Sequence, residues 1–326
     1  MITVKPTILL TGKTGQIGCE LDRLLLQLGQ VFAPNRDELD LFNADSIRRV
    51  IRETRPQLIV NAAAYTAVDA AENDESNAYA INAEAPALLA EEAKRLGAFL
   101  VHYSTDYVFD GSKRSPYSES DETNPLNVYG RTKLVGDQAI LESGAAHLIF
   151  RTSWVYATHG RNFMLTILRL ATEREELRIV QDQTGAPTCA ADLAVATTKI
   201  LTGILTRTKG AFNFTAASGT YHMTAEGQTS WHEFAKAILE EAGRAPQNLL
   251  WFTAATNGRP LIASRVLPIS TEEFQSRTRR PAYSVLSNTH LIRTFGVSLS
   301  YWRTQLQRCF NSEPIPANLP AGLSSR

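Results

Sequence analysis

Short apolar runs alternate with longer amphipathic stretches through the first half of the chain, and this alternation limits the possible folds more than any other feature. The apolar runs have the length and composition of buried strands, and each stretch between two runs is long enough for a helix. Parallel strands joined by such crossovers are connected in the right-handed sense, which places helices on both faces of one sheet. We therefore predict an α/β fold built on a doubly wound parallel sheet.

The same pattern places the expected elements along the chain. In the first half we predict strands over residues 8–11, 31–34, 58–62, 99–104 and 148–153, and helices over residues 17–28, 45–53, 86–96 and 128–142. Asp45 or Ser46 is the expected N-cap of the second helix, and Gly97 closes the third. After about residue 155 the pattern is less regular, with helices expected over 161–174, 191–205 and 230–242 and strands over 177–180 and 211–215.

Charge balance and cysteine content narrow the class of protein. The 33 Lys and Arg residues balance the 33 Asp and Glu residues, whereas proteins that bind a nucleic-acid backbone usually carry a basic excess. No apolar stretch approaches the ~20 residues of a membrane-spanning helix, and the opening residues lack a signal peptide's apolar region. Cys19, Cys189 and Cys309 are too widely spaced to indicate a disulfide framework or a cysteine-rich zinc site. We expect a cytoplasmic protein without nucleic-acid or membrane partners.

Glycines directly follow the first predicted strand, in segment 11–18. The spacing of Gly12, Gly15 and Gly18 suits the phosphate-binding turn of a Rossmann fold, which needs a tight turn, room for a pyrophosphate and close packing of helix on strand. The spacing alone could mark an ordinary turn, but its place between a buried strand and an amphipathic helix favours dinucleotide binding. The expected cofactor contacts of this loop are Gly12, Thr14, Gly15, Gln16, Ile17 and Gly18.

The end of the second predicted strand bears on the choice between NADPH and NADH. An acidic side chain there would bind the ribose 2′-hydroxyl of NADH and repel the 2′-phosphate of NADPH. The strand is followed instead by Asn35 and Arg36, a hydrogen-bond donor and a cation, ahead of Asp37. This order favours NADPH; NADH stays possible, because a shift of one or two residues would bring Asp37 to the ribose.

Tyr129 and Lys133 stand four residues apart on a predicted helix and therefore share one face. An unperturbed tyrosine, with a pKa of about 10, is poorly matched to proton transfer at neutral pH, and a neighbouring ammonium would lower that pKa. The alternative is a surface lysine beside a half-buried tyrosine. A hydroxyl at the end of the fourth predicted strand, that of Ser104 or Thr105, could bind a reacting carbonyl, because open α/β sheets bind ligands at this edge.

The glycine loop and the Tyr129–Lys133 pair resemble those of the extended short-chain dehydrogenase/reductases. Longer segments are similar to the dTDP-4-dehydrorhamnose reductases within that superfamily, and they follow in order through most of the chain to about residue 310. These segments are 11–18, 61–69, 103–111, 126–133, 151–156 and 182–188. The resemblance implies NADPH-dependent reduction of the 4-keto group of dTDP-6-deoxy-L-lyxo-4-hexulose to dTDP-L-rhamnose, for cell-surface polysaccharide.

The same resemblance implies roles for individual residues. Thr105 would hydrogen-bond the keto oxygen, Tyr129 would protonate it, and Lys133 would hold the nicotinamide ribose while tuning Tyr129. The remaining implied contacts are Asp40 and Leu41 at the adenine end, Ala63, Ala64 and Thr66 along the cofactor, and Val68, Asp106 and Trp154 at the sugar.

The nucleotide diphosphate has less specific candidates. Asn162 stands where related enzymes often place an amide against it, and Arg280, with Arg279, offers guanidinium groups suited to bidentate pairing. A solvated face is the alternative for both arginines. We interpret three further aromatic residues as core rather than as partners of the thymine base, namely Phe163, Trp231 and Trp251.

Some relatives are described as joining two chains through Mg²⁺ held by glutamates. Glu20 matches the first such position, but Arg308 stands at the later one, and a cation there would repel the metal. We therefore expect no metal site, and a monomer or a weak homodimer.

Residues 1–155 are thus predicted to form an NAD(P)-binding domain with the catalytic helix. Residues 156–310 would form mainly a nucleotide-sugar domain, able to return strands to the first sheet, and residues 311–326 a disordered tail.

The alternative functions are those of another nucleotide-sugar epimerase or dehydratase, or of a non-catalytic NADP-binding regulatory subunit of the methionine adenosyltransferase type. Dehydratases commonly have an acid pair after the catalytic threonine, whereas here Asp106 is followed by Tyr107. The intact Thr105, Tyr129 and Lys133 weigh against the regulatory subunit.

Overall fold

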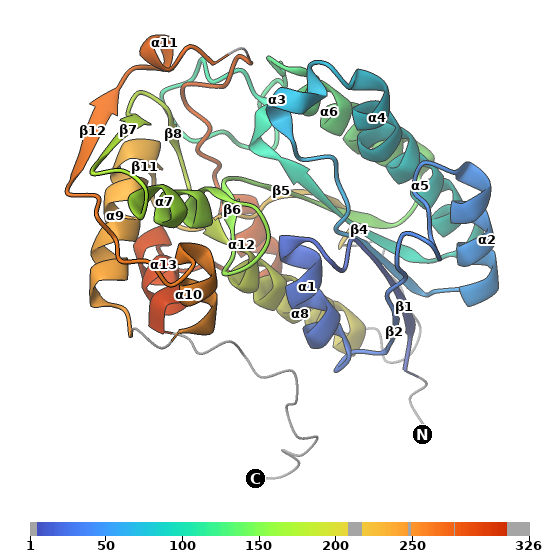
Figure 1. Ribbon diagram of the computed structural model, residues 1–326. Coiled ribbons are helices and arrows are strands. Elements are labelled where there is room, and N and C mark those ends of the chain that lie inside the picture. Colours follow the sequence, from blue (N-terminus) through green and yellow to red (C-terminus); the bar gives the residue numbers. More distant parts are fainter. Residues whose placement is uncertain (1–4, 208–216, 247–248, 277, 312–326) are drawn as a thin grey trace.

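A computed structural model describes residues 5–207, 217–246, 249–276 and 278–311. Its centre is a six-stranded sheet of parallel neighbours, in the order β10-β5-β4-β3-β1-β2 (Figure 1). The strands are β1 (Thr7–Thr11), β2 (Gln30–Phe32), β3 (Leu58–Asn61), β4 (Phe99–Thr105), β5 (His147–Thr152) and β10 (Gly219–His222). The order reverses at β1, which has β2 on one side and β3 on the other. The predicted doubly wound sheet is therefore confirmed.

Helices cover both faces of this sheet, because its strands are apolar on both sides. One layer contains α1 (Gln16–Leu25), α8 (Ala190–Arg207) and α12 (Thr289–Phe295), and the other contains α2 (Ala44–Thr54), α5 (Ala85–Leu96) and α6 (Val128–Ser143). In β4 every side chain is buried, with Val101 in the first core and Leu100 in the second. Alternate residues of one strand thus fill two separate cores.

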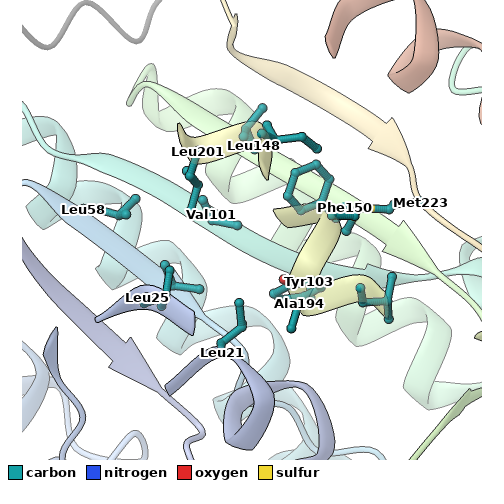
Figure 2. Close-up of a cluster of buried hydrophobic side chains, with 14 of the residues drawn as sticks. Leu21, Leu25, Leu58, Val101, Tyr103, Leu148, Phe150, Ala194, Leu201 and Met223 are labelled. Atoms are coloured by element: carbon teal, nitrogen blue, oxygen red, sulfur yellow. The ribbon is translucent and has the colours of Figure 1, made fainter. Parts of the chain in front are cut away.

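Figure 2 shows the core between the sheet and the α1–α8 layer, where Leu201 lies near Val101 and Leu25 belongs to the same cluster. Tyr103 of β4 points into the same layer, and its hydroxyl lies 2.6 Å from the hydroxyl of Thr197 on α8. A buried tyrosine needs such a partner for its polar tip. The side chain of Tyr103 therefore ties β4 to α8, while its backbone carbonyl accepts from Lys133 Nζ at 2.6 Å.

Short helical segments lie at the carboxyl ends of β3 and β4. They are α3 (Val68–Ala71), α4 (Glu75–Tyr79), the π-helical segment Ala80–Glu84 that leads into α5, and the 3₁₀ turn Asp106–Val108. These segments were not predicted, because a helix of one or two turns is too short to show an apolar period in the sequence. The fully buried side chain of Asn82 donates to the Tyr65 carbonyl at 3.0 Å and accepts from the Tyr65 N–H at 2.8 Å. These bonds hold the loop that follows β3 against α4 and α5.

A second lobe packs around another apolar core, which includes Phe234, Ile238, Trp302 and Leu306 (Figure 1). Its helices are α7 (Phe163–Ala171), α9 (Trp231–Arg244), α10 (Leu250–Thr256), α11 (Thr271–Phe274) and α13 (Trp302–Asn311). Its strands pair two by two: β7 (Glu176–Val180) with β12 (Arg265–Ile269), β8 (Thr184–Gly185) with β11 (Thr229–Ser230), and β6 (Val155–Tyr156) with β9 (Thr188–Cys189). Within the described ranges, no helix has both the length and the apolar character of a bilayer span.

Several element ends differ from the prediction. α1 ends at Leu25 rather than at residue 28, and α2 is capped by Asn43, whose side chain accepts from the N–H groups of both predicted caps, Asp45 and Ser46. From the second half of the chain, α8 and β10 return to the first sheet. The predicted strand 211–215 lies outside the described residues, as does the predicted tail beyond Asn311, which itself ends α13.

The turn between β1 and α1 depends on close backbone approach. Gly12 has a φ of +75°, and a Cβ on it would lie 2.6 Å from the backbone nitrogen of Ala63. A Cβ on Gly18, within α1, would lie 2.0 Å from the carbonyl oxygen of Gly12. Both neighbours are backbone atoms, so a side chain at either position would force the helix and the loop apart.

We expect Gly18→Ala to lower the free energy of unfolding by about 1–3 kcal/mol, the usual cost of overpacking. The matched control is Gly203→Ala in α8, where an added Cβ would meet nothing within 4 Å. This control should raise stability by about 0.5–1 kcal/mol, because alanine restricts the unfolded chain and favours the helix. Urea unfolding of both variants measures the difference. Equal stability of the two would contradict the packing described for Gly18.

Candidate functional site

A cavity of about 1020 Å³ opens at the carboxyl ends of β1, β3, β4 and β5. It lies at the reversal of strand order, where open α/β sheets bind their ligands. Most of the residues predicted for the site line it: Gly12, Thr14, Gly15, Gln16, Ile17, Asn35, Arg36, Asp40, Leu41, Ala63, Ala64, Thr66, Val68, Thr105, Asp106, Tyr129, Lys133 and Trp154. Gly18, Asn162 and Arg280 are outside its lining.

The glycine loop forms one end of the cavity and fits a dinucleotide. Gly15 is the N-cap of α1 and has no side chain, so no cap hydrogen bond covers the first turn of the helix. Uncapped N–H groups and the helix dipole favour a phosphate there. Gly12 packs so closely on the backbone of Ala63 that a Cβ would not fit, which keeps the loop tight beside the cavity. Arg36 and Asp37, the two residues that the sequence analysis weighed for cofactor choice, both lie on the wall beyond this loop.

Tyr129 and Lys133 reach the other end of the cavity from the first turns of α6. Asn127 caps this helix, with its side chain accepting from the N–H of Gly130 at 2.8 Å. Thr105 ends β4; its hydroxyl donates to Asp106 Oδ1 at 3.1 Å, accepts from the N–H of Tyr107 at 3.1 Å, and hydrogen-bonds Tyr129. The strand and the helix therefore bring the three predicted catalytic residues to one wall.

Of the two candidate hydroxyls, that of Ser104 is used inside the protein. It donates to Asp137 Oδ2 at 2.9 Å, on the face of β4 that packs against α6. The same carboxylate oxygen accepts from Arg151 Nε at 3.2 Å. Thr105 is left as the hydroxyl that contacts the Tyr129 side chain.

Burial dominates the pKa values of this cluster. Burial raises the pKa of Tyr129 to about 12, against an opposing effect of its hydrogen bond with Thr105. Burial lowers the pKa of Lys133 to about 8, and the nearby Asp137 opposes this. The expectation that Lys133 lowers the pKa of Tyr129 is therefore not met, because the Lys133 amine points to the Tyr103 carbonyl, 2.6 Å away. Burial also raises the pKa of Asp106 to about 7, although the hydrogen bond from Thr105 acts in the other direction.

A buried histidine behind the cavity was not predicted. His102 on β4 is fully buried, with Nε2 3.0 Å from Lys133 Nζ and Nδ1 3.0 Å from Asn61 Nδ2. A signal for it does exist in the sequence. A histidine inside an apolar strand must find hydrogen-bond partners on whichever face it points to.

Two tryptophans stack at the side of the cavity formed by the second lobe. Trp154 follows β5 and Trp231 begins α9; their ring centroids are 3.4 Å apart and their planes differ by 6°. Trp154 has a φ of 47°, a backbone conformation that costs a non-glycine residue about 1 kcal/mol or more. Trp231 packs against the core of the second lobe, as predicted, and it also lines the cavity. Phe163 packs against Trp231, and Trp251 belongs to the core of the second lobe.

Asn162 and Arg280, predicted for the diphosphate, are engaged by protein groups. Asn162 caps α7 and donates to Gln16 Oε1 at 3.0 Å, which links the second lobe to the glycine loop. Arg280 pairs with Asp69 through Nη2, which donates to both carboxylate oxygens at 2.8 Å. Arg161, which the sequence analysis did not single out, is exposed and lines the cavity beside Trp154.

The positions weighed for a bridging metal are also paired. Glu20 accepts from Arg23 at 2.7 Å, and Arg308 pairs with Asp192.

Comparison with known proteins identifies the relatives of this chain. A family model described as RmlD substrate binding domain matches residues 6–314. A dTDP-4-dehydrorhamnose reductase from Burkholderia thailandensis is 49% identical over 303 residues, 93% of this chain and 97% of the relative. The chain belongs to the dTDP-4-dehydrorhamnose reductase family.

A second curated relative and a solved structure are also similar to this chain. The dTDP-4-dehydrorhamnose reductase of Escherichia coli K12 is 42% identical over 308 residues, 93% of this chain and 97% of the relative. The crystal structure of dTDP-4-dehydrorhamnose reductase from Bacillus anthracis in complex with NADP has a TM-score of 0.82 at 35% identity, covering 94% of this chain and 99% of that one. The family that the sequence segments predicted is thus confirmed, and so is its fold.

The tryptophan stack gives a prediction of its own. A Cβ on Gly185 would lie 2.4 Å from Trp154 Cε2, so we expect Gly185→Ala to push the indole of Trp154 off Trp231. Two stacked indoles couple their electronic transitions, and circular dichroism detects that coupling. The signal should weaken in Gly185→Ala, vanish in Trp231→Phe, and persist in the control Gly203→Ala. A full signal in Gly185→Ala would show that the stack does not depend on this glycine.

Proposed function

We propose that this protein uses NADPH to reduce the 4-keto group of dTDP-6-deoxy-L-lyxo-4-hexulose, forming dTDP-L-rhamnose. Family membership supports the reaction, and the Bacillus anthracis relative, whose structure is a complex with NADP, supports the cofactor. The observation that carries the proposal is the meeting of Thr105, Tyr129 and Lys133 on one cavity wall, opposite the glycine loop. Reduction then needs only a hydride donor and a proton donor at the same carbonyl.

Bound NADPH would supply a hydride to C4 of the sugar. Negative charge would then develop on the keto oxygen, where donors already in place are most effective. The Thr105 hydroxyl would donate to that oxygen, and the Tyr129 hydroxyl would transfer its proton to it. Because the pKa of Tyr129 is about 12, its phenol is protonated at neutral pH and enters the reaction as an acid. The Lys133 amine would hold the nicotinamide ribose.

The nucleotide sugar would lie toward the second lobe. We propose that Trp154, Val68 and Asp106 contact the sugar, since all three line the cavity near Thr105. Arg161 offers an exposed guanidinium for the diphosphate. Arg280 could serve the same phosphates only by exchanging its carboxylate partner Asp69.

We also propose a cell compartment and an oligomeric state for this protein. The free cysteines Cys19, Cys189 and Cys309 suit a reducing compartment, so we propose that the enzyme is cytoplasmic. A monomer or a weak homodimer without a bridging metal remains our prediction, because Arg308 places a cation beside Asp192.

Tyr129→Phe removes the proposed acid with the least change in shape. We expect kcat for the reduction of the 4-keto sugar to fall about 100-fold to 10,000-fold, the usual contribution of general acid catalysis. NADPH binding should change little. NADPH oxidation in the presence of the keto sugar measures the rate, and Tyr79→Phe at an exposed position is the control. No reduction by the wild type would reject the reaction, whereas full activity in Tyr129→Phe would reject only its mechanism.

Arg36→Ala tests the contact proposed for the 2′-phosphate of NADPH. Hydrogen bonds to charged groups contribute about 1.5–3 kcal/mol, so we expect the KM for NADPH to rise about tenfold to 100-fold. The KM for NADH should stay the same, since NADH lacks that phosphate. Arg114→Ala, at an exposed position outside the cavity, is the matched control. Unchanged NADPH affinity in Arg36→Ala would assign the phosphate to another residue.

A further inference from the structure

Lys133 is held inside the protein by groups that the proposed mechanism does not use. Its side chain is 1% exposed; its Nζ donates to the Tyr103 carbonyl at 2.6 Å and lies 3.0 Å from His102 Nε2. On the same helix, Asp137 Oδ1 is 4.0 Å from that histidine nitrogen. A fully buried histidine therefore stands between the lysine amine and the interior of the sheet.

The other side of the His102 ring determines which nitrogen carries its proton. Nδ1 lies 3.0 Å from Asn61 Nδ2. Asn61 Oδ1 accepts from the N–H of Ala63 at 3.3 Å and from the Thr11 hydroxyl at 2.6 Å. A backbone N–H can only donate, so the Asn61 oxygen faces Ala63 and its NH₂ group faces His102. Nδ1 is then an acceptor, and the neutral ring carries its proton on Nε2.

This tautomer directs an N–H donor at the Lys133 amine. A neutral amine can accept that hydrogen bond, whereas an ammonium has only donors. Burial holds the pKa of His102 well below its usual value, so the ring stays neutral. The ring therefore cannot accept a bond from a charged Lys133 unless its proton moves to Nδ1 and the Asn61 amide turns.

We infer that His102, oriented by Asn61, is a positioning residue that fixes the Lys133 amine and favours its neutral form. This inference rests on the proposed catalytic use of Lys133. It can be tested apart from catalysis, because it concerns only the proton affinity of the Lys133 amine.

Other charged groups face the same amine. Asp137 of α6 favours the ammonium, and Arg151 of β5 offsets part of that effect by donating to Asp137. Tyr129, one helical turn earlier, is neutral. Burial lowers the pKa of Lys133 to about 8 and Asp137 opposes this shift, so Lys133 can gain and lose a proton near neutral pH, which a surface lysine cannot do.

Titration of Lys133 in the full-length protein tests the inference directly. The chain has eight lysines, so NMR of ¹³C-labelled lysine side chains resolves few signals, and Lys133→Arg identifies the one of interest. His102→Gln supplies an amide oxygen that can face Nζ. We expect the Lys133 midpoint to rise by about one pH unit or more, a tenfold gain in proton affinity.

The matched control is His147→Gln, at a buried histidine on the neighbouring strand β5 whose Nδ1 lies 2.8 Å from the Ala145 carbonyl. It should leave the Lys133 midpoint unchanged, because His147 has no contact with the amine. A shift of equal size in this control would overturn the inference, since it would make the effect a general one of replacing a buried histidine.

Asn61→Asp should change the hydrogen bond between His102 and Lys133 in a different way, and it tests the inference if His102→Gln does not fold. Its carboxylate would accept from Nδ1–H, which turns Nε2 into an acceptor toward Lys133 and again raises the midpoint. The alkaline limb of the kcat profile should move by the same amount. An unchanged midpoint in both folded variants would overturn the inference even in an active reductase. Failure of the wild type to reduce the sugar would reject the proposed function and leave the titration result standing.

Discussion

Parallel pairing of the central strands is the constraint on which the rest of this structure depends. A parallel pair cannot be closed by a tight turn, so each connection must cross the sheet and carries a helix. All carboxyl ends then lie at one edge, and the reversal of order at β1 opens a crevice between the connections that leave in opposite directions. The glycine loop, Thr105 and the start of α6 meet there because they follow strands of the same sheet.

Because α6 packs on this sheet, polar side chains on its inward face are buried against apolar strands. Its inward face carries Lys133 and Asp137, both nearly inaccessible to solvent, and burial without partners would cost each of them several kcal/mol. β4 supplies those partners through His102 and Ser104 on its α6 face, and the neighbouring β5 supplies Arg151. The catalytic end of the cavity thus stands on a buried polar network in which Asp137 Oδ2 accepts from two donors, while the buried Oδ1 has no hydrogen-bond partner among the described residues.

Local hydropathy was sufficient to predict the first five strands of the sheet, the long helices between them and the edge at which ligands bind. Features that depend on contacts between distant segments were not predictable in this way. β10 is a strand because β5 offers it a free edge, and its four residues carry little signal of their own. Trp231 is equally apolar in a core or on a cavity wall, and only its stacking on Trp154 decides between them. His102 differs, since a polar residue in an apolar strand already indicates a buried partner.

The hydrogen bond from Thr105 to Asp106 constrains how a carbonyl could be bound. The Thr105 hydroxyl has one proton, and in this structure it goes to Asp106 Oδ1, while the N–H of Tyr107 donates to its oxygen. To donate to a keto oxygen, Thr105 must release the carboxylate. Burial raises the pKa of Asp106 to about 7, and its buried Oδ2 still needs a donor, because it has no hydrogen-bond partner among the described residues. A sugar hydroxyl that donated to Asp106 would meet that need and compete with Thr105. The contact that anchors the sugar would therefore also free the proton donor for its carbonyl.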